Sequence, residues 1–218
     1  MTTSPAAPLA VTIVPVTLFQ QNASIVVCTA TGRGIVVDPG GDLPRLRAAI
    51  DQTGATIERI VLTHGHIDHA GGAAELAEAL GVPIEGPHEA DAFLLADLEN
   101  SGRRYRIPGR PFVPDRWLAD GDEVAVGERR FAVRHVPGHS PGHVVLIDAA
   151  ASFALVGDTL FAGSVGRTDM DYADHDTLMR GIRAALMTLD DGVTILPGHG
   201  PASTIGRERA ENPFLQAP

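Results

Sequence analysis

The chain has 218 residues, 44% of them hydrophobic and 20% charged, which is typical of one soluble globular domain with a sizeable core. All 17 basic residues are arginines and the net charge is −10, so the cationic excess that binds nucleic acid is missing. The single cysteine excludes an internal disulfide, and with neither a signal peptide nor an apolar run of roughly 18 residues we expect no membrane contact and a cytoplasmic location.

The first half of the chain alternates strand and helix patterns. Runs rich in β-branched residues predict strands, and apolar residues at helical spacing predict helices. Strands are expected at 11–18, 23–29, 34–37 and 57–62, and helices at 43–52, 73–80 and 88–99. Gly81 and Pro83 end the second helix, as glycine and proline commonly do.

The stretch NSGRRYRIPGRPFVP, residues 100–114, interrupts this alternation. It holds Arg103, Arg104, Arg106 and Arg110 among glycines and prolines, which predicts a long surface loop. Such loops often serve as lids or binding loops, although a solvated charged face is an equal alternative. Further strands are expected at 123–126, 129–136, 144–148, 153–156 and 193–196, and helices at 175–189, with Asp174 as its cap, and 203–211.

The sequence THGHIDHAGG follows the fourth predicted strand and concentrates four polar side chains. Residues two apart in an extended segment point the same way, so His64 and His66 can bind one ion. Asp68 and His69 lie where the chain turns into the next helix and can face a second position. Imidazole and carboxylate groups together suit zinc, iron or manganese.

Four groups cannot fill the shells of two ions, and the chain offers three more at the ends of apolar strand-like runs. His139 lies in VPGHSPGH, Asp158 in VGDTLF and His199 in LPGHG, each flanked by glycine. A carboxylate can bridge two cations, which is the natural role for Asp158. The alternative of unrelated surface histidines is disfavoured, because polar clusters with ligand spacing usually mark metal or catalytic sites.

The motifs THGHIDH, PGHSPGH, GDTLF and PGHG, in this order, resemble the metallo-β-lactamase superfamily, and more narrowly its glyoxalase II-like (hydroxyacylglutathione hydrolase-like) members. GSVGRTD, residues 163–169, is similar to their compact bacterial branch. The resemblance extends over nearly the whole chain. It implies an α/β fold, a four-layer αβ/βα sandwich in which two sheets face each other, helices cover both outer faces and metals sit at one edge. We expect residues 1–218 to form this single domain, without a C-terminal glutathione-binding helical domain.

The resemblance also implies two divalent ions, most simply Zn²⁺, with iron or manganese as alternatives. His64, His66 and His139 would hold the first ion, Asp68, His69 and His199 the second, and Asp158 would bridge them. His143 matches a position that is usually not a ligand and is expected to pack behind the site. Asp38, in VDPGG, either orients a ligand histidine or forms a turn; both readings stay open. His88 and His135 are expected to be surface or strand residues, and His175 to help begin its helix.

Two cations activate a water that attacks an acyl carbonyl, and Asp68 is the catalytic candidate for holding its proton. A thiolate leaves without much acid assistance, so thioesters such as S-D-lactoylglutathione are the expected small-molecule substrates. Without the C-terminal helical segment of full-length relatives, strict glutathione specificity is in doubt, and Arg167 is the candidate contact for an anionic substrate. The oligomeric state is left open.

Four other functions compete with this hypothesis. A persulfide dioxygenase would use one iron on His64, His139 and Asp158. A lactonase would use the same hydroxide, and a non-catalytic metal-binding scaffold would keep the ligands without the reaction. A β-lactamase is less expected, because the common zinc enzymes place a cysteine where Asp158 stands and the only cysteine here, Cys28, is distant.

Overall fold

The computed structural model describes residues 7–148, 150 and 152–216. The strands are β1 (Leu9–Val16), β2 (Gln21–Cys28), β3 (Arg33–Val37), β4 (Thr56–Val61), β5 (Ile84–Glu85), β6 (Glu123–Val126), β7 (Arg129–His135), β8 (Val144–Asp148), β9 (Phe153–Gly157), β10 (Leu160–Phe161), β11 (Ser164–Val165), β12 (Thr194–Pro197) and β13 (Ser203–Thr204). The helices are α1 (Leu43–Thr53), α2 (Ile67–Ala70), α3 (Ala73–Leu80), the 3-10 turn η1 (Glu89–Asp91), α4 (Ala92–Ala96), α5 (Leu98–Tyr105), α6 (His175–Ala185), α7 (Ile205–Glu211) and α8 (Pro213–Gln216).

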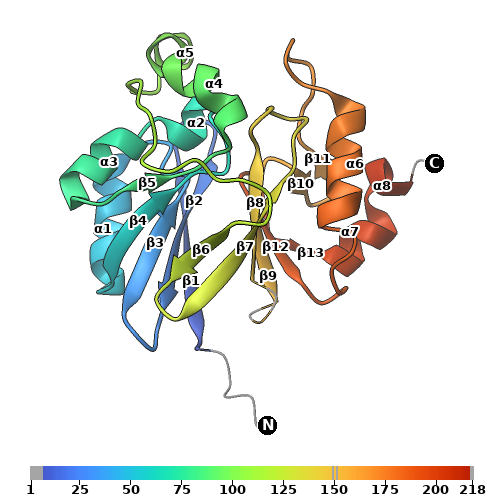
Figure 1. The fold of residues 1–218 in the computed structure, drawn as a ribbon, viewed down its shortest axis with the longest axis horizontal. Coiled ribbons are helices and arrows are strands. Elements are labelled where there is room, and N and C mark those ends of the chain that lie inside the picture. The colour runs from blue at the N-terminus through green and yellow to red at the C-terminus, as the bar shows by residue number, and fades with distance from the viewer. Residues whose placement is uncertain (1–6, 149, 151, 217–218) are drawn as a thin grey trace.

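Two mixed sheets form the centre of the molecule (Figure 1). The first has the strand order β1-β2-β3-β4-β5, and the second has the order β13-β12-β9-β8-β7-β6. In the first sheet β3 runs parallel to β4, and in the second β9 runs parallel to β12. Because parallel neighbours end at the same edge, the residues that follow these strands emerge together.

The side chains of β3 show how the layers are built. Ile35 and Val37 are buried between the two sheets, whereas Val36, on the other face, packs with Leu46 of α1 and Leu76 of α3. The second sheet repeats this arrangement, with Val145 of β8 packed against Leu178 of α6. The expected four-layer αβ/βα sandwich is therefore confirmed, with helices on both outer faces (Figure 1).

The expectation of a loop over 100–114 is wrong for its first part, because 100–105 belong to helix α5. The sequence there lacks a periodic apolar stripe, and the helix is instead fixed by buried Leu98 and Gly102. A side chain at Gly102 would come within 2.6 Å of the Ile107 carbonyl oxygen, so only glycine allows this close approach. The predicted helix at 88–99 is divided among η1, α4 and the start of α5.

The remaining differences are short elements and helix ends. Helix α6 ends at Ala185 rather than at residue 189, and residues 203–204 pair as β13 before α7 begins. Asp174 caps α6 as expected, since its carboxylate accepts a hydrogen bond from the Thr177 N–H, and His175 is the first residue of the helix. Among the described residues, no helix is both long enough and apolar enough to cross a bilayer.

Candidate metal centre

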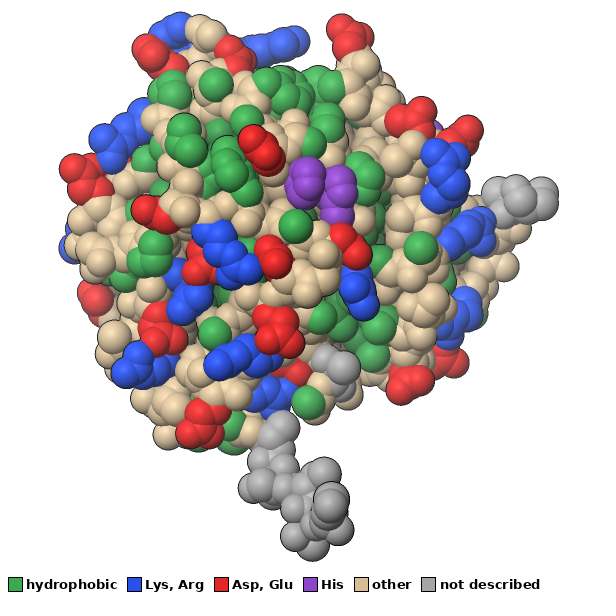
Figure 2. Space-filling model, viewed as in Figure 1, with side chains coloured by type: hydrophobic (Ala, Val, Ile, Leu, Met, Phe, Trp, Pro, Cys, Tyr) green, Lys and Arg blue, Asp and Glu red, His purple; other side chains and the backbone are tan. Residues whose placement is uncertain are grey.

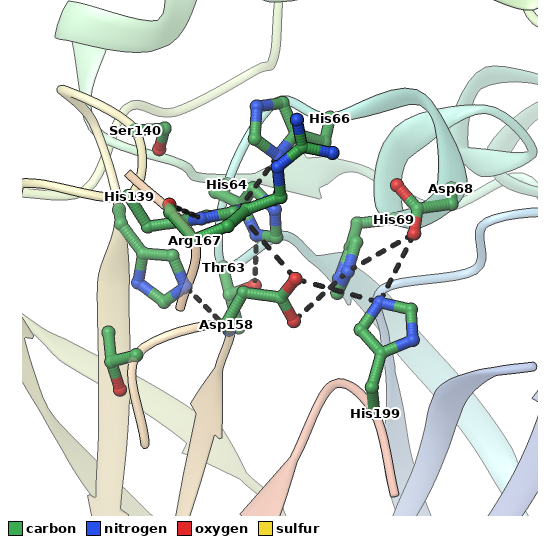
Figure 3. Close-up of polar contacts among 12 residues, drawn as sticks. Thr63, His64, His66, Asp68, His69, His139, Ser140, Asp158, Arg167 and His199 are labelled. Carbon is green, nitrogen blue, oxygen red and sulfur yellow. Dashed lines mark hydrogen bonds and ion pairs between the residues drawn. The ribbon is translucent and has the colours of Figure 1, made fainter. Parts of the chain in front are cut away.

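All seven candidate ligands lie at one edge of the two sheets (Figure 3). The segment after β4 carries His64 and His66 and continues into α2, which carries Asp68 and His69. From the second sheet come His139 after β7, Asp158 at the end of β9 and His199 after β12. The sequence thus places four candidates on one half of the molecule and three on the other.

The first group consists of His64, His66 and His139. Nδ1 of His66 lies 3.0 Å from Nε2 of His64 and 3.0 Å from Nε2 of His139. One ring nitrogen from each of the three residues lies within 4.8 Å of the other two, close enough for a single ion. This is the trio expected for the first ion.

The second group consists of Asp68, His69 and His199, which also lie within 4.8 Å of one another. Asp68 Oδ2 is 3.2 Å from His199 Nε2 and 3.8 Å from His69 Nε2. Asp158 lies between the two groups: Oδ1 is 3.4 Å from His69 Nε2, and Oδ2 is 3.5 Å from His199 Nε2 and 3.6 Å from His139 Nε2. Its carboxylate faces both positions, as a bridging ligand would.

The outer nitrogens of these histidines have hydrogen-bond acceptors, which determines where the ring protons are. Nδ1 of His139 donates to the Arg167 carbonyl oxygen at 2.8 Å, and Nδ1 of His199 donates to the Phe19 carbonyl oxygen at 3.2 Å. A carbonyl oxygen only accepts, so each ring in its neutral form carries its proton on Nδ1 and turns an unprotonated Nε2 toward the centre. This is the tautomer that a metal ion requires.

Asp38 sets the proton positions of two further rings. Its Oδ2 accepts from Nδ1 of His69 at 2.9 Å and from the Thr63 hydroxyl at 2.6 Å. Because the hydroxyl donates to Asp38, it accepts from Nδ1 of His64 at 3.0 Å. His64 and His69 therefore also present Nε2 to the centre. Asp38 also has the left-handed backbone of a turn residue (φ 52°). Its geometry therefore agrees with both hypotheses for this position, a residue that orients a ligand histidine and a residue that forms a turn.

An Asp38→Asn variant is expected to bind metal about 10- to 100-fold more weakly, because asparagine has one acceptor oxygen, whereas Asp38 accepts from the Thr63 N–H at one oxygen and from His69 Nδ1 at the other. Elemental analysis after dialysis against a graded chelator measures this loss. Asp42→Asn is the matched control, since Asp42 also has a left-handed backbone (φ 47°) and accepts from the Thr17 N–H outside the site. Equal metal retention by the two variants would show that Asp38 acts only as a turn residue.

His143 lies behind the centre. Its Nε2 accepts the backbone N–H of Asp158 at 2.9 Å, and its ring stacks on that of His64 at a centroid distance of 4.8 Å. Because Nε2 is already used as an acceptor, His143 does not face the two groups of candidate ligands. It instead fixes the backbone position of Asp158 and the plane of the His64 ring.

The pKa shifts reflect a crowded, buried and charged centre. Burial, followed by the neighbouring His139, lowers the pKa of His66 to about 3. Burial alone would raise the pKa of Asp158, but His69 outweighs it and holds the pKa of this carboxyl far below its usual range. Burial also opposes protonation of His69, yet Asp158 and Asp68 raise its pKa well above the ordinary value. The carboxylates thus favour a positive charge where His69 Nε2 points.

The residues fit divalent cations. Nε2 of His69 and Oδ1 of Asp158 are both buried and have no hydrogen-bond partner among the described residues. Leaving such groups unpaired in a protein interior is costly, and a cation between them would satisfy both. Gly198 allows the close packing, because a side chain there would collide with Asp158 Oδ1 and the His69 ring. Nitrogen and oxygen ligands of this kind suit zinc, iron and manganese.

Two residues that the sequence analysis did not identify contact the segments of this centre. Asp91 is buried and accepts hydrogen bonds from the Gly65 N–H at 2.8 Å, the Ser140 hydroxyl at 2.8 Å and the Gly142 N–H. It thereby ties the THGHIDH segment to the PGHSPGH segment. Tyr172 places its hydroxyl 2.8 Å from His66 Nε2. Burial raises the pKa of Tyr172 to about 12, so the hydroxyl stays protonated at neutral pH.

A cavity of about 870 Å³ opens above the centre. Its wall combines aromatic side chains, among them Phe19, Phe93, Tyr105 and Tyr172, with the polar groups of the candidate ligands. Figure 2 shows hydrophobic side chains gathered at the top of the molecule, in the hollow between α5 and the segment that precedes α6. The opening is large enough for a small molecule with an apolar part.

The arginines differ in their relation to this cavity. Arg167 lines it, and its guanidinium forms two hydrogen bonds with Asp169, at 2.7 and 2.9 Å. Arg104 also lines the cavity, 5.5 Å from the Tyr105 ring centroid. Arg103 pairs instead with Glu99 on the exposed face of α5, and Arg110 pairs with Glu78. The arginine-rich stretch is thus partly a cavity wall and partly a solvated surface.

Comparison with known proteins gives consistent relatives. The model of the metallo-beta-lactamase superfamily matches residues 16–199. Hydroxyacylglutathione hydrolase GloC of Haemophilus influenzae is 40% identical over 207 residues, covering 94% of this chain and 97% of that protein. The crystal structure of TTHA1623 in a di-iron-bound form is 36% identical, with a TM-score of 0.85 over 94% of this chain and 100% of that one. The crystal structure of the BLEG-1 B3 metallo-beta-lactamase is 31% identical, with a TM-score of 0.87 over 95% and 100%.

Proposed function

This chain belongs to the metallo-beta-lactamase superfamily and is a metallo-hydrolase that binds divalent metal, and we propose that its substrates are thioesters of the hydroxyacylglutathione type. The proposal includes two ions, held by the two groups of ligands with Asp158 between them. The resemblance to GloC supports the substrate class, and the di-iron form of TTHA1623 supports a pair of ions.

One observation carries the two-ion proposal. His64, His69, His139 and His199 have their outer nitrogens committed to acceptors, so their inner nitrogens, which are the free ligand atoms of the neutral rings, converge around the Asp158 carboxylate. A persulfide dioxygenase with one iron on His64, His139 and Asp158 would leave Asp68, His69 and His199 clustered without a purpose. Zinc is the proposed metal, with iron and manganese as the alternatives that the same donors accept.

Bound divalent cations lower the pKa of a coordinated water and polarise the acyl carbonyl. The chain's own contribution includes Asp68, whose carboxylate faces the centre with Oδ2 3.2 Å from His199 Nε2. Burial alone would raise the pKa of Asp68, but His69 and His199 lower it, so this carboxylate is ionised at neutral pH. We assign to it the role of accepting a proton from the attacking water.

A thioester fits the chemistry of the cavity. Among the residues that line it, the titratable side chains are carboxylates, arginines, tyrosines and the candidate ligand histidines, and none is an evident acid for a poor leaving group. A thiolate leaves without such an acid, because its conjugate thiol has a pKa of about 8.5. The cavity also holds apolar side chains that can cover the rest of the molecule.

The test combines elemental analysis of the purified protein with a substrate panel. We expect two equivalents of metal per chain and faster hydrolysis of S-D-lactoylglutathione than of an ester, a lactone or a β-lactam. The β-lactam is included because BLEG-1 is named a B3 metallo-beta-lactamase. Metal-loaded protein that hydrolyses only the lactone or the β-lactam would overturn the thioester proposal, and protein that hydrolyses nothing would favour a metal-binding scaffold.

Alanine at Arg167 or Arg104 is expected to raise KM for an anionic thioester by up to roughly fivefold, with kcat little changed, because exposed charges contribute modestly to binding. Arg167→Ala keeps the carbonyl oxygen that orients His139, so the substitution tests the guanidinium alone. Arg103→Ala is the matched control, since Arg103 lies on the same helix as Arg104 and pairs with Glu99 away from the cavity. Unchanged KM in both test variants would remove arginine from the account of substrate binding.

A further inference from the structure

Tyr172 places a hydroxyl beside the candidate metal centre from a segment that carries none of the candidate ligands. Its oxygen is 2.8 Å from His66 Nε2, and its side chain lines the cavity. The ring packs edge-on against Phe93 of α4, with centroids 5.3 Å apart and an angle of 70° between the planes. The contact with Phe93 orients the ring from one side, and the side chain stays partly exposed to the cavity.

The direction of the hydrogen bond between His66 and Tyr172 follows from the first group of ligands. Nδ1 of His66 faces Nε2 of His64 and Nε2 of His139, and both of these nitrogens are unprotonated. When the three hold a cation, His66 Nδ1 is unprotonated as well, so the ring proton is on Nε2. Nε2 therefore donates to the Tyr172 oxygen, and the hydroxyl proton of Tyr172 is left to point elsewhere.

Within residues 7–148, 150 and 152–216, His66 is the one hydrogen-bond partner of the Tyr172 hydroxyl, so that proton has no acceptor there. Because the side chain lines the cavity, the unused O–H is available to a bound molecule. It lies one imidazole ring away from the point where His64, His66 and His139 converge. A donor at this position reaches atoms that lie one or two bonds from a carbonyl bound at the centre.

The two sides of a thioester differ at this distance. In thiols of the cysteine type, the first atoms beyond sulfur are carbons, which accept no hydrogen bond. On the acyl side, the nearest possible acceptor is an oxygen on the carbon next to the carbonyl. We propose that Tyr172 donates a hydrogen bond to this oxygen and so selects 2-hydroxyacyl thioesters over their deoxy analogues, an inference that rests on the proposed thioesterase function.

The decisive comparison uses lactoyl- and propionyl-glutathione, which differ only in that hydroxyl. We expect wild type to hydrolyse the lactoyl thioester with the higher kcat/KM, and Tyr172→Phe to lower the lactoyl-to-propionyl ratio about tenfold, since the loss of one hydrogen bond has an effect of about this size. Phenylalanine keeps the ring and its contact with Phe93. Tyr105→Phe, which removes a hydroxyl from the same cavity at a ring that packs on Phe19, is expected to keep the ratio.

Two measurements that do not depend on catalysis distinguish a contact between Tyr172 and the substrate from a role of Tyr172 in positioning His66. The metal content of Tyr172→Phe should equal that of wild type, and calorimetry should show that wild type but not the variant binds D-lactate more tightly than propionate. Loss of metal, or an equal fall in both efficiencies, would show that Tyr172 only positions His66. Wild type that hydrolyses both thioesters equally would overturn this inference alone. Wild type that hydrolyses neither would refute the proposed function, and the lactate comparison would still decide the role of Tyr172.

Discussion

Replacing Asp158 by alanine is expected to lower kcat/KM for the thioester by on the order of 10³-fold or more and to reduce the bound metal. Its two carboxylate oxygens face His69, His139 and His199 at 3.4 to 3.6 Å. The substitution thus removes the one anion that both ligand groups share. Steady-state kinetics on protein of measured metal content checks the expectation.

Asp158→Asn separates charge from volume, because asparagine fills the same space without a negative charge. We expect Asp158→Asn to lower kcat/KM and the bound metal nearly as much as Asp158→Ala does. Asp176→Ala, an exposed carboxylate in the first turn of α6, controls for the loss of one negative charge elsewhere. An Asp158→Ala protein that keeps two ions and retains activity within tenfold of wild type would rule out the bridging role.

Removing the metal is expected to lower the melting temperature by roughly 10 °C. An ion present at a thousand times its dissociation constant stabilises the folded state by about 4 kcal/mol, and each kcal/mol shifts Tm by about 2–4 °C in a chain of this size. The physical reason is that Asp68 and Asp158 crowd two negative charges into a buried centre. Calorimetry before chelation, after it and after readdition of Zn²⁺ measures the effect.

The metal-dependent rise in Tm should grow as the pH increases from about 6 to 8. In the metal-free protein, burial lowers the pKa of His69 and His199, but Asp158 and Asp68 outweigh it and raise both. A raised folded-state pKa stabilises the protein below the unfolded value, near 6.5, and this contribution is lost as the pH rises through the folded value. The ion takes the place of these protons, so it raises Tm most at a pH at which His69 and His199 have lost them.

His64 and His66 do not contribute to the pH dependence of the metal-dependent rise in Tm. Burial lowers the pKa of both, so they are neutral over this range with or without metal. A Tm that is unaffected by verified chelation at pH 8 would contradict the view that the ions stabilise the fold. A difference in Tm between metal-loaded and metal-free protein that shrinks as the pH rises would contradict the proposed protonation of His69 in the metal-free protein.

The sequence predicted the sheets and the principal helices well, because β-branched runs and apolar spacing are local signals. It failed at α5, where the helix is defined by Leu98 and Gly102 packing against distant residues rather than by a repeating stripe. It also missed two-residue strands such as β5 and β13, whose pairing is decided by neighbouring strands. Such elements have too few residues to show any period.

The candidate ligands could be found because each one follows a strand and lies in a glycine-flanked motif, and the structure brings all seven to one edge. Asp91 and Tyr172 do not lie in such a motif. Asp91 contacts Gly65 across 26 positions and Gly142 across 51, and Tyr172 contacts His66 across 106. Contacts at these separations depend on the finished fold, so a single sequence gives no local pattern from which to predict them.

The division of the candidate ligands between the two halves makes metal retention a gauge of complete assembly. A fragment that stopped after β8 would keep His64 to His139 but would lack Asp158 and His199, and with them the bridge and part of the second group. The number of ions bound per chain therefore measures how completely a preparation of the chain, of a truncation or of a circular permutant has folded, before any substrate is known.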